Sequence, residues 1–181
     1  MPDDHSAHST AEDLTSLSRD RATSDARPAP LAPAGGRLPE ALFEIAVAAM
    51  WSDGELAAEE VERGHALTRE LRTRPRRGGS PFGAIAAGAL PFGDLEFDTL
   101  NDQERRLAYA VSHWVTAMPQ PPSPRRTGFM RGLQLRLRLD DREAAMLRDV
   151  VSVVAETADT NDADAELALL LGALCPLPIA R

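Results

Sequence analysis

Apolar residues recur three and four positions apart through most of residues 39–175, and turn-forming residues interrupt the pattern at intervals. This spacing places apolar side chains on one face of an α-helix, whereas a half-buried strand needs a spacing of two. Aromatic residues make up only 4% of the chain, so the core must be built from Ala, Leu and Val. Sheets normally draw on aromatic and β-branched residues. We therefore expect an all-α fold with short loops.

Capping residues and helix breakers divide this region into roughly seven predicted helices. Asn101 with Glu104, and Asp140 with Glu143, have the spacing of capping boxes at helix starts. Gly64 allows a close approach of its helix to a neighbour. The predicted helices span residues 39–51, 58–72, 82–90, 101–118, 129–137, 141–157 and 165–174. In the helix over 141–157, the residues expected to face the core are Met146, Leu147, Val150, Val151 and Val154.

One segment, LQLRLRL at residues 133–139, alternates leucine with polar residues in the manner of a strand. We predict a helix there for two reasons. Phe129 and Met130 already continue a helical spacing into it, and a single strand in this chain would have no strand to pair with.

Composition and charge exclude several classes of protein. The net charge of −8 argues against a general affinity for nucleic acid or anionic membranes. A single cysteine, Cys175, allows neither an internal disulfide nor a thiolate cluster for zinc. No segment approaches the ~18 apolar residues of a membrane span. The N-terminus has acids and histidines where a signal peptide needs positive charge, so we expect a cytoplasmic protein.

Two regions of different character divide the chain. Residues 1–38 are rich in Ser, Asp, Ala and Pro and lack an apolar period, which predicts a disordered N-terminal arm. Residues 39–181 are expected to form one helical domain.

Two helical hairpins within that domain resemble each other: residues 46–71 and residues 110–137. Each consists of an apolar helix, a break and a second helix. The shift that places Leu67 on Leu133 also places Glu60 on Arg126, so the second hairpin keeps the apolar frame and lacks the acids. We interpret the two as related copies, with a chance similarity of Ala/Leu-rich hairpins as the alternative.

Carboxylates gather where the first predicted helix breaks at Asp53-Gly54. A hairpin turn there brings Asp53 and Glu60 toward each other, and Glu55 is available as a third oxygen ligand. Hard divalent cations such as Ca²⁺ or Mg²⁺ prefer such ligands. The alternative is helix capping, because Glu60 stands at the third position of a capping box. Ala57, at the cap position, has no side-chain oxygen, so only half of that box can form.

The segments AMWSDGELAAEE, LNDQERRLAYAVSHWVTA and LRLRLDDREAAML together resemble the TerB-like helical family of tellurite-resistance proteins. The resemblance covers most of residues 39–155. It implies an all-helical, non-catalytic protein whose acidic turn is a cation site, with Asp53 and Glu60 as ligands and Glu55 as an additional one. It also implies a stress-response or tellurite-resistance setting. The family's second acidic turn is absent from this chain.

Two functions follow from these patterns, and neither is enzymatic. The first is a TerB-like binding protein that holds a divalent cation; the alternative is a metal-free helical scaffold or protein-interaction module. The sequence contains no phosphate-binding loop, nucleophile elbow or paired zinc ligands. His65 and His113 each lie in a predicted helix without a nucleophile nearby in sequence. We expect a protein partner of unknown identity, and neither a nucleic-acid partner nor a membrane span.

Overall fold

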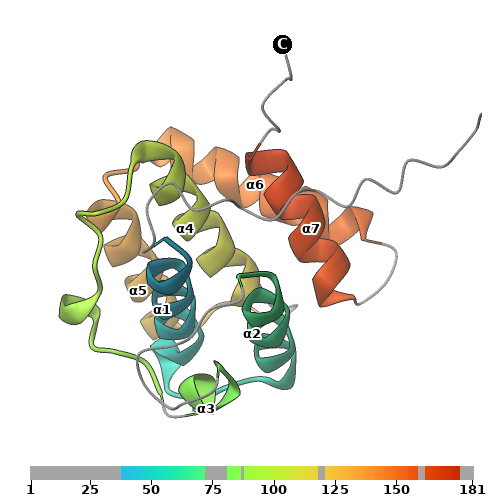
Figure 1. Cartoon of the computed structure of the whole chain (residues 1–181). Helices are drawn as coiled ribbons and strands as arrows, with labels where there is room; N and C mark the ends of the chain where they lie inside the picture. Colours follow the sequence, from blue (N-terminus) through green and yellow to red (C-terminus); the bar gives the residue numbers. More distant parts are fainter. Residues whose placement is uncertain (1–37, 72–80, 87, 118–120, 159–161, 176–181) are drawn as a thin grey trace, which may run out of the picture.

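The computed structural model describes residues 38–71, 81–86, 88–117, 121–158 and 162–175. Its elements are α1 (Leu38–Met50), the 3₁₀ turn η1 (Trp51–Asp53), α2 (Ala58–Leu71), α3 (Pro81–Ala86), the 3₁₀ turn η2 (Phe92–Asp94), α4 (Asp102–Val115), α5 (Pro124–Arg136), α6 (Asp141–Thr157) and α7 (Ala163–Leu174). Within these ranges no residue lies in a β-strand, which confirms the predicted all-α class. Figure 1 shows the arrangement of the helices.

Several sequence predictions extend beyond these ranges. The expected N-terminal arm lies outside the described residues except for Leu38, which is buried and begins α1. Met118, expected at the end of a helix over 101–118, also lies outside them, and α4 ends at Val115.

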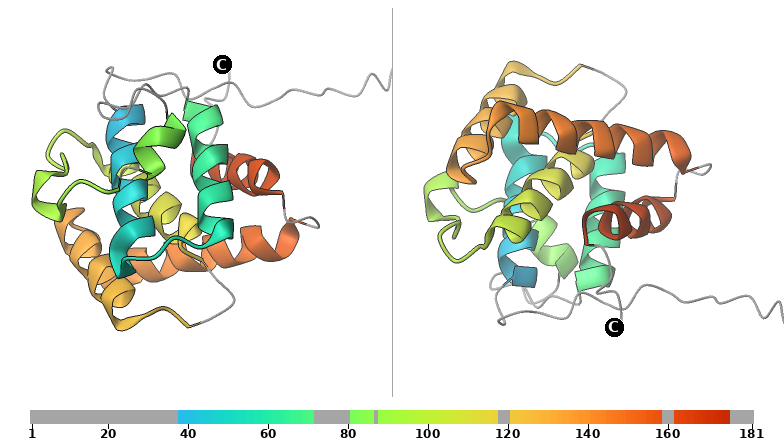
Figure 2. Two further views of the ribbon diagram at one scale, coloured as in Figure 1. Left: turned by 90° about the horizontal axis from the view of Figure 1, so that it is seen from below. Right: turned by 90° about the horizontal axis from the view of Figure 1, so that it is seen from above.

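Helix α1 is buried on almost every side. Ten of its 13 residues are buried, which is more than the single apolar face that the sequence predicted. A helix that is apolar all round needs neighbours all round. Helices α2, α4 and α5 all contact α1, and α4 makes the most extensive contact (Figures 1 and 2).

Close packing of α2 against α1 depends on Gly64, as predicted. A Cβ atom at this position would lie 3.0 Å from both Met50 Cε and Ile85 Cδ1. The missing side chain therefore lets α2 approach α1 and α3 together.

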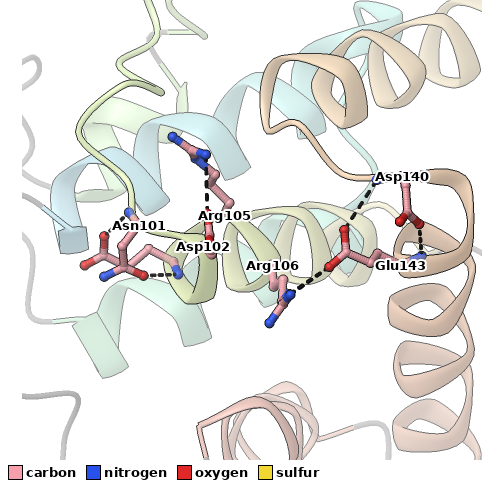
Figure 3. A network of polar contacts seen from close by, with 7 residues as sticks. Asn101, Asp102, Arg105, Arg106, Asp140 and Glu143 are labelled. Atoms are coloured by element: carbon pink, nitrogen blue, oxygen red, sulfur yellow. Dashed lines mark hydrogen bonds and ion pairs between the residues drawn. The ribbon is translucent and has the colours of Figure 1, made fainter.

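Both predicted capping boxes are present (Figure 3). Asn101 Oδ1 accepts from the Glu104 N–H at 3.0 Å, and Glu104 Oε2 accepts from the Asn101 N–H at 2.8 Å. Asp140 and Glu143 make the same exchange at 2.7 and 3.4 Å. Glu143 Oε1 also accepts from Arg106 Nη2 at 2.7 Å, so the cap of α6 is tied to α4.

The LQLRLRL segment is helical up to Arg136, as predicted, and its last residues leave the helix. Arg138 has a left-handed conformation with φ of 58°, and the Leu139 N–H donates to the Gln134 carbonyl at 3.1 Å. These are features of a Schellman helix end. Leu139 is buried in the turn, whereas Leu135 is 63% exposed. The alternation therefore reflects a helix face followed by one buried turn residue.

Helix α6 has the predicted bounds, but the prediction that Met146 faces the core is wrong, because this residue is 51% exposed. The buried face of α6 is formed by Leu147, Val151 and Val154. Met146 precedes Leu147 by one position, which is about 100° around the helix. It therefore points away from the face on which the others meet the core.

Helix α7 packs on α2 and α6 (Figures 1 and 2). The carboxylate of Glu166 is buried, and its Oε2 accepts from Trp114 Nε1 at 2.7 Å and from Arg63 Nε at 3.2 Å. On the surface, Arg69 of α2 pairs with Asp164 of α7 at 2.6 Å.

Candidate functional site

The acidic turn begins where α1 tightens into η1. Gly54 follows η1 in a left-handed conformation with φ of 91°, which glycine adopts without strain. Asp53 Oδ1 accepts from the Glu55 N–H at 3.4 Å across this turn. Trp51 Nε1 donates to the Ile85 carbonyl at 2.8 Å and holds the turn against α3.

Glu60 is the deeply buried member of the turn, with no exposed surface. Its Oε2 accepts from the Ala57 N–H at 2.9 Å, which is the surviving half of the capping box that the sequence predicted. Burial raises the pKa of Glu60, and the neighbouring Asp53 acts in the same direction. The Ala57 N–H, Arg126 and Arg63 oppose that change.

Arg126 stands between the two carboxylates. Ser123 caps α5 by accepting from the Arg126 N–H at 3.1 Å, which places Arg126 in the first turn of α5. Its Nη2 lies 2.7 Å from Asp53 Oδ2 and 2.7 Å from Glu60 Oε1. The contact with Glu60 Oε1 lacks the alignment of a hydrogen bond, so it is an ion pair only. We call Asp53, Glu60 and Arg126 the arginine clamp.

The structure thus brings together two of the three predicted ligands. Asp53 and Glu60 converge on one point, but a guanidinium nitrogen stands at that point. Glu55 is exposed and contacts Asp53 through its backbone N–H. A cation with six or more oxygen ligands would have to displace Arg126. Among the described residues, no group of three or more His, Cys, Asp or Glu side chains is placed to hold a metal ion.

Arg126 was not among the residues predicted from the sequence. The shift between the two hairpins placed it opposite Glu60, and that correspondence was the only sequence signal for it. In the structure the two positions are in direct contact.

A pocket of about 460 Å³ adjoins the arginine clamp, between α4, α5 and α6. Arg126 belongs to both. The residues that line the pocket are Tyr109, His113, Thr116, Ala117, Pro122, Arg126, Thr127, Met130, Arg131, Gln134, Arg148 and Ser152. Three of these described residues are arginines and none is a carboxylate.

Hydrogen bonds hold two of the pocket's arginines in place. Arg148 Nη1 donates to the Tyr109 hydroxyl at 3.0 Å. Arg131 Nη1 lies 2.7 Å from Asp141 Oδ1, which also accepts from Gln134 Nε2 at 2.8 Å. Both contacts keep the pKa of Asp141 below its usual value.

The sequence indicated no functional role for His113, which lies in a helix without a nucleophile nearby. In the structure it lines this pocket. Burial lowers the pKa of His113, and the charge of Arg148 lowers it further. The lowered pKa favours the neutral imidazole, in which one nitrogen donates and the other accepts.

We found no match to the sequence among models of protein families, among curated proteins or among solved structures. Within the described part of the chain, no helix is both long and apolar enough to cross a membrane.

Proposed function

We propose that this chain is a non-catalytic helical binding protein whose acidic turn is closed by Arg126 and works without a metal ion. The observation that carries the proposal is the position of Arg126 Nη2, at 2.7 Å from both Asp53 and Glu60. A guanidinium there offsets part of the negative charge that a bound cation would otherwise offset. The turn then serves as a structural joint between the first hairpin and α5.

The proposed family character and biological setting of this protein are based on its sequence. The TerB-like character, the relation between the two hairpins, and the tellurite-resistance or stress setting rest on the resemblance given above. A cytoplasmic location is part of the same proposal. The absence of catalytic motifs from the sequence supports a binding role.

A second candidate is a binding protein that holds a divalent cation. The observation in its favour is that Asp53 and Glu60 converge on one point, as cation ligands must. In that case Arg126 leaves when the cation enters, and Glu55 joins the ligand set.

Thermal melting of the full chain with and without millimolar Ca²⁺ or Mg²⁺ separates the two candidates. A cation that binds only the folded state raises the melting temperature by mass action. We expect no rise in the wild-type protein. Arg126→Gln should lower the free energy of unfolding by about 3 kcal/mol, because it leaves a buried carboxylate unpaired. Arg125→Gln, the exposed neighbour, should change it by less than about 0.5 kcal/mol.

A matched pair of double variants tests the cation directly. Asp53→Asn with Glu60→Gln removes the two converging carboxylates, while Glu59→Gln with Glu62→Gln removes the same charge from exposed positions of α2 that belong to neither ligand set. A cation-dependent rise in the wild type that the first pair abolishes and the second keeps would refute the metal-free proposal.

A further inference from the structure

We propose that the pocket between α4, α5 and α6 binds a small organic anion, in which a carboxylate or phosphate group is joined to an apolar body. This inference rests on the proposed function, because it names the ligand class of a protein that works by binding. It uses different residues from the acidic turn, apart from Arg126.

The charged side chains that line the pocket are opposite in sign to the net charge of the chain. The protein carries a net charge of −8, yet the described residues that line the pocket include three arginines and no Asp or Glu. A concave site of one sign concentrates ligands of the opposite sign. An anion is therefore the ligand that this site attracts.

The three arginines differ in how far their charge is already neutralised. Arg126 is shared by Asp53 and Glu60, and Arg131 is paired with Asp141. Arg148 donates to the neutral hydroxyl of Tyr109, and no carboxylate among the described residues lies within ion-pairing distance of it. Arg148 is thus the arginine whose charge remains available to a ligand.

Tyr109 extends this donor site. Tyr109 is 2% exposed, and its hydroxyl oxygen accepts a hydrogen bond from Arg148. A phenol hydroxyl both accepts and donates, so its own O–H can still donate to a ligand oxygen. Arg148 and Tyr109 together offer a charged donor and a neutral donor side by side, which suits a carboxylate or a phosphate.

The rest of the lining favours a ligand with an apolar body. Met130, Ala117 and Pro122 contribute carbon surface beside these donors. The volume of about 460 Å³ lies within the usual range for small-molecule sites. A bare inorganic ion would leave most of that surface without a contact.

Calorimetric titration of the full chain with phenyl phosphate and with benzoate tests the inference, with benzyl alcohol as the neutral analogue. We expect one of the two anions, or both, to bind with one-to-one stoichiometry, and benzyl alcohol not to bind measurably. The comparison of the two anions decides between phosphate and carboxylate. If neither anion binds, or if benzyl alcohol binds equally well, the inference is wrong.

Two matched pairs of variants locate the binding on α6. Arg148→Gln should weaken binding at least about tenfold, because it removes a charge-assisted hydrogen bond. Arg142→Gln removes the same charge from the same helix outside the pocket and should change affinity by less than about twofold. Equal losses in the two variants would indicate non-specific charge attraction and would overturn the inference.

Ser152→Glu provides a second test that does not remove a native contact. Ser152 lines the pocket one helical turn after Arg148, so a carboxylate there would pair with Arg148 and repel the anion. Ala155→Glu places the same charge on an exposed position of α6 outside the pocket. The first should abolish binding and the second should preserve it; loss in both, or in neither, contradicts the inference.

Failure of this inference is distinguishable from failure of the proposed function. Anion binding is measured at the pocket, whereas the proposal that the arginine clamp works without a metal ion is tested by cation-dependent melting. Absence of anion binding with an unchanged melting temperature would remove only the pocket assignment. A cation-dependent melting temperature together with anion binding would refute only the proposal that the arginine clamp works without a metal ion.

Discussion

Glu60 is a residue at which two effects oppose each other. Its side chain has no exposed surface, and burial disfavours the ionised form. Arg126 and the Ala57 N–H favour the ionised form, but burial is the larger effect, so the pKa of Glu60 is raised. Ionised Glu60 therefore costs more in the folded protein than in the unfolded chain.

This balance predicts how stability depends on pH. A raised folded pKa contributes stability that is fully present below the unfolded value of 4.5 and is lost as the pH rises through the folded pKa. The side chain introduced by Glu60→Gln cannot ionise, so the variant does not lose this stability as the pH rises. We expect the variant to gain stability relative to the wild type as the pH rises from 4 toward 7. Urea unfolding at several pH values measures this difference.

The wild type and Glu60→Gln share every other titrating group, including Asp53, so their difference isolates the buried carboxylate and its neighbours Arg126 and Arg63. The opposite slope, with the variant losing stability as the pH rises, would mean that the ion pair with Arg126 outweighs burial.

The two carboxylates of the arginine clamp could be predicted from the sequence, because their closeness depends on local spacing alone. Asp53 and Glu60 lie seven positions apart across one hairpin turn, so the turn alone brings them together. Arg126 arrives from the start of α5, and its approach depends on how α5 packs against η1. Local spacing carries no information on such packing, so the sequence predicted the two acids, with a cation or helix capping as alternatives, and not the arginine that lies between them.

At the scale of the element, the end of α5 carries backbone strain. Arg138 has a φ of 58°, a conformation that costs an L-residue with a side chain roughly 1–2 kcal/mol and glycine very little. Glycine also loses more chain entropy on folding, by roughly 0.5–1 kcal/mol. We expect Arg138→Gly to raise the free energy of unfolding by about 0.5 kcal/mol in chemical denaturation.

Arg138→Ala is the control for this helix end, because it removes the same side chain and keeps the strained φ. It should be close to neutral. If Arg138→Gly were no more stable than Arg138→Ala, the left-handed residue would not be a source of strain.

The capping boxes at Asn101 and Asp140 were predictable because their signals are local, whereas α5 begins at Pro124 and not at residue 129. Which face of a helix meets the core was less predictable. Met146 and Leu147 are both apolar, and only the position of the neighbouring helices decides that Leu147 is buried and Met146 exposed. The pocket depends on the same long-range packing, since its residues come from α4, α5 and α6.

At the scale of the whole molecule, α7 is joined to the rest of the bundle by one buried and one exposed ion pair. The buried pair links Glu166 to Arg63, whose guanidinium also lies over the Trp114 ring at 5.8 Å and donates to the Ala117 carbonyl. The exposed pair links Asp164 to Arg69, with side chains 56% and 52% exposed. The two pairs join the same two helices, so they can be compared directly.

We expect Glu166→Gln to destabilise the protein far more than Asp164→Asn, although each removes one negative charge from α7. Glu166→Gln leaves Arg63 with little solvent and, among the described residues, no carboxylate within ion-pairing distance, which should cost about 2–3 kcal/mol. Asp164→Asn leaves Arg69 in water, where an exposed pair contributes about 0–1 kcal/mol. Urea unfolding, followed by tryptophan fluorescence because Trp114 contacts Glu166, measures both. Equal costs would mean that α7 is held by its buried leucines, Leu167, Leu170 and Leu171, and that the ion pair with Arg63 contributes little to joining it to the bundle.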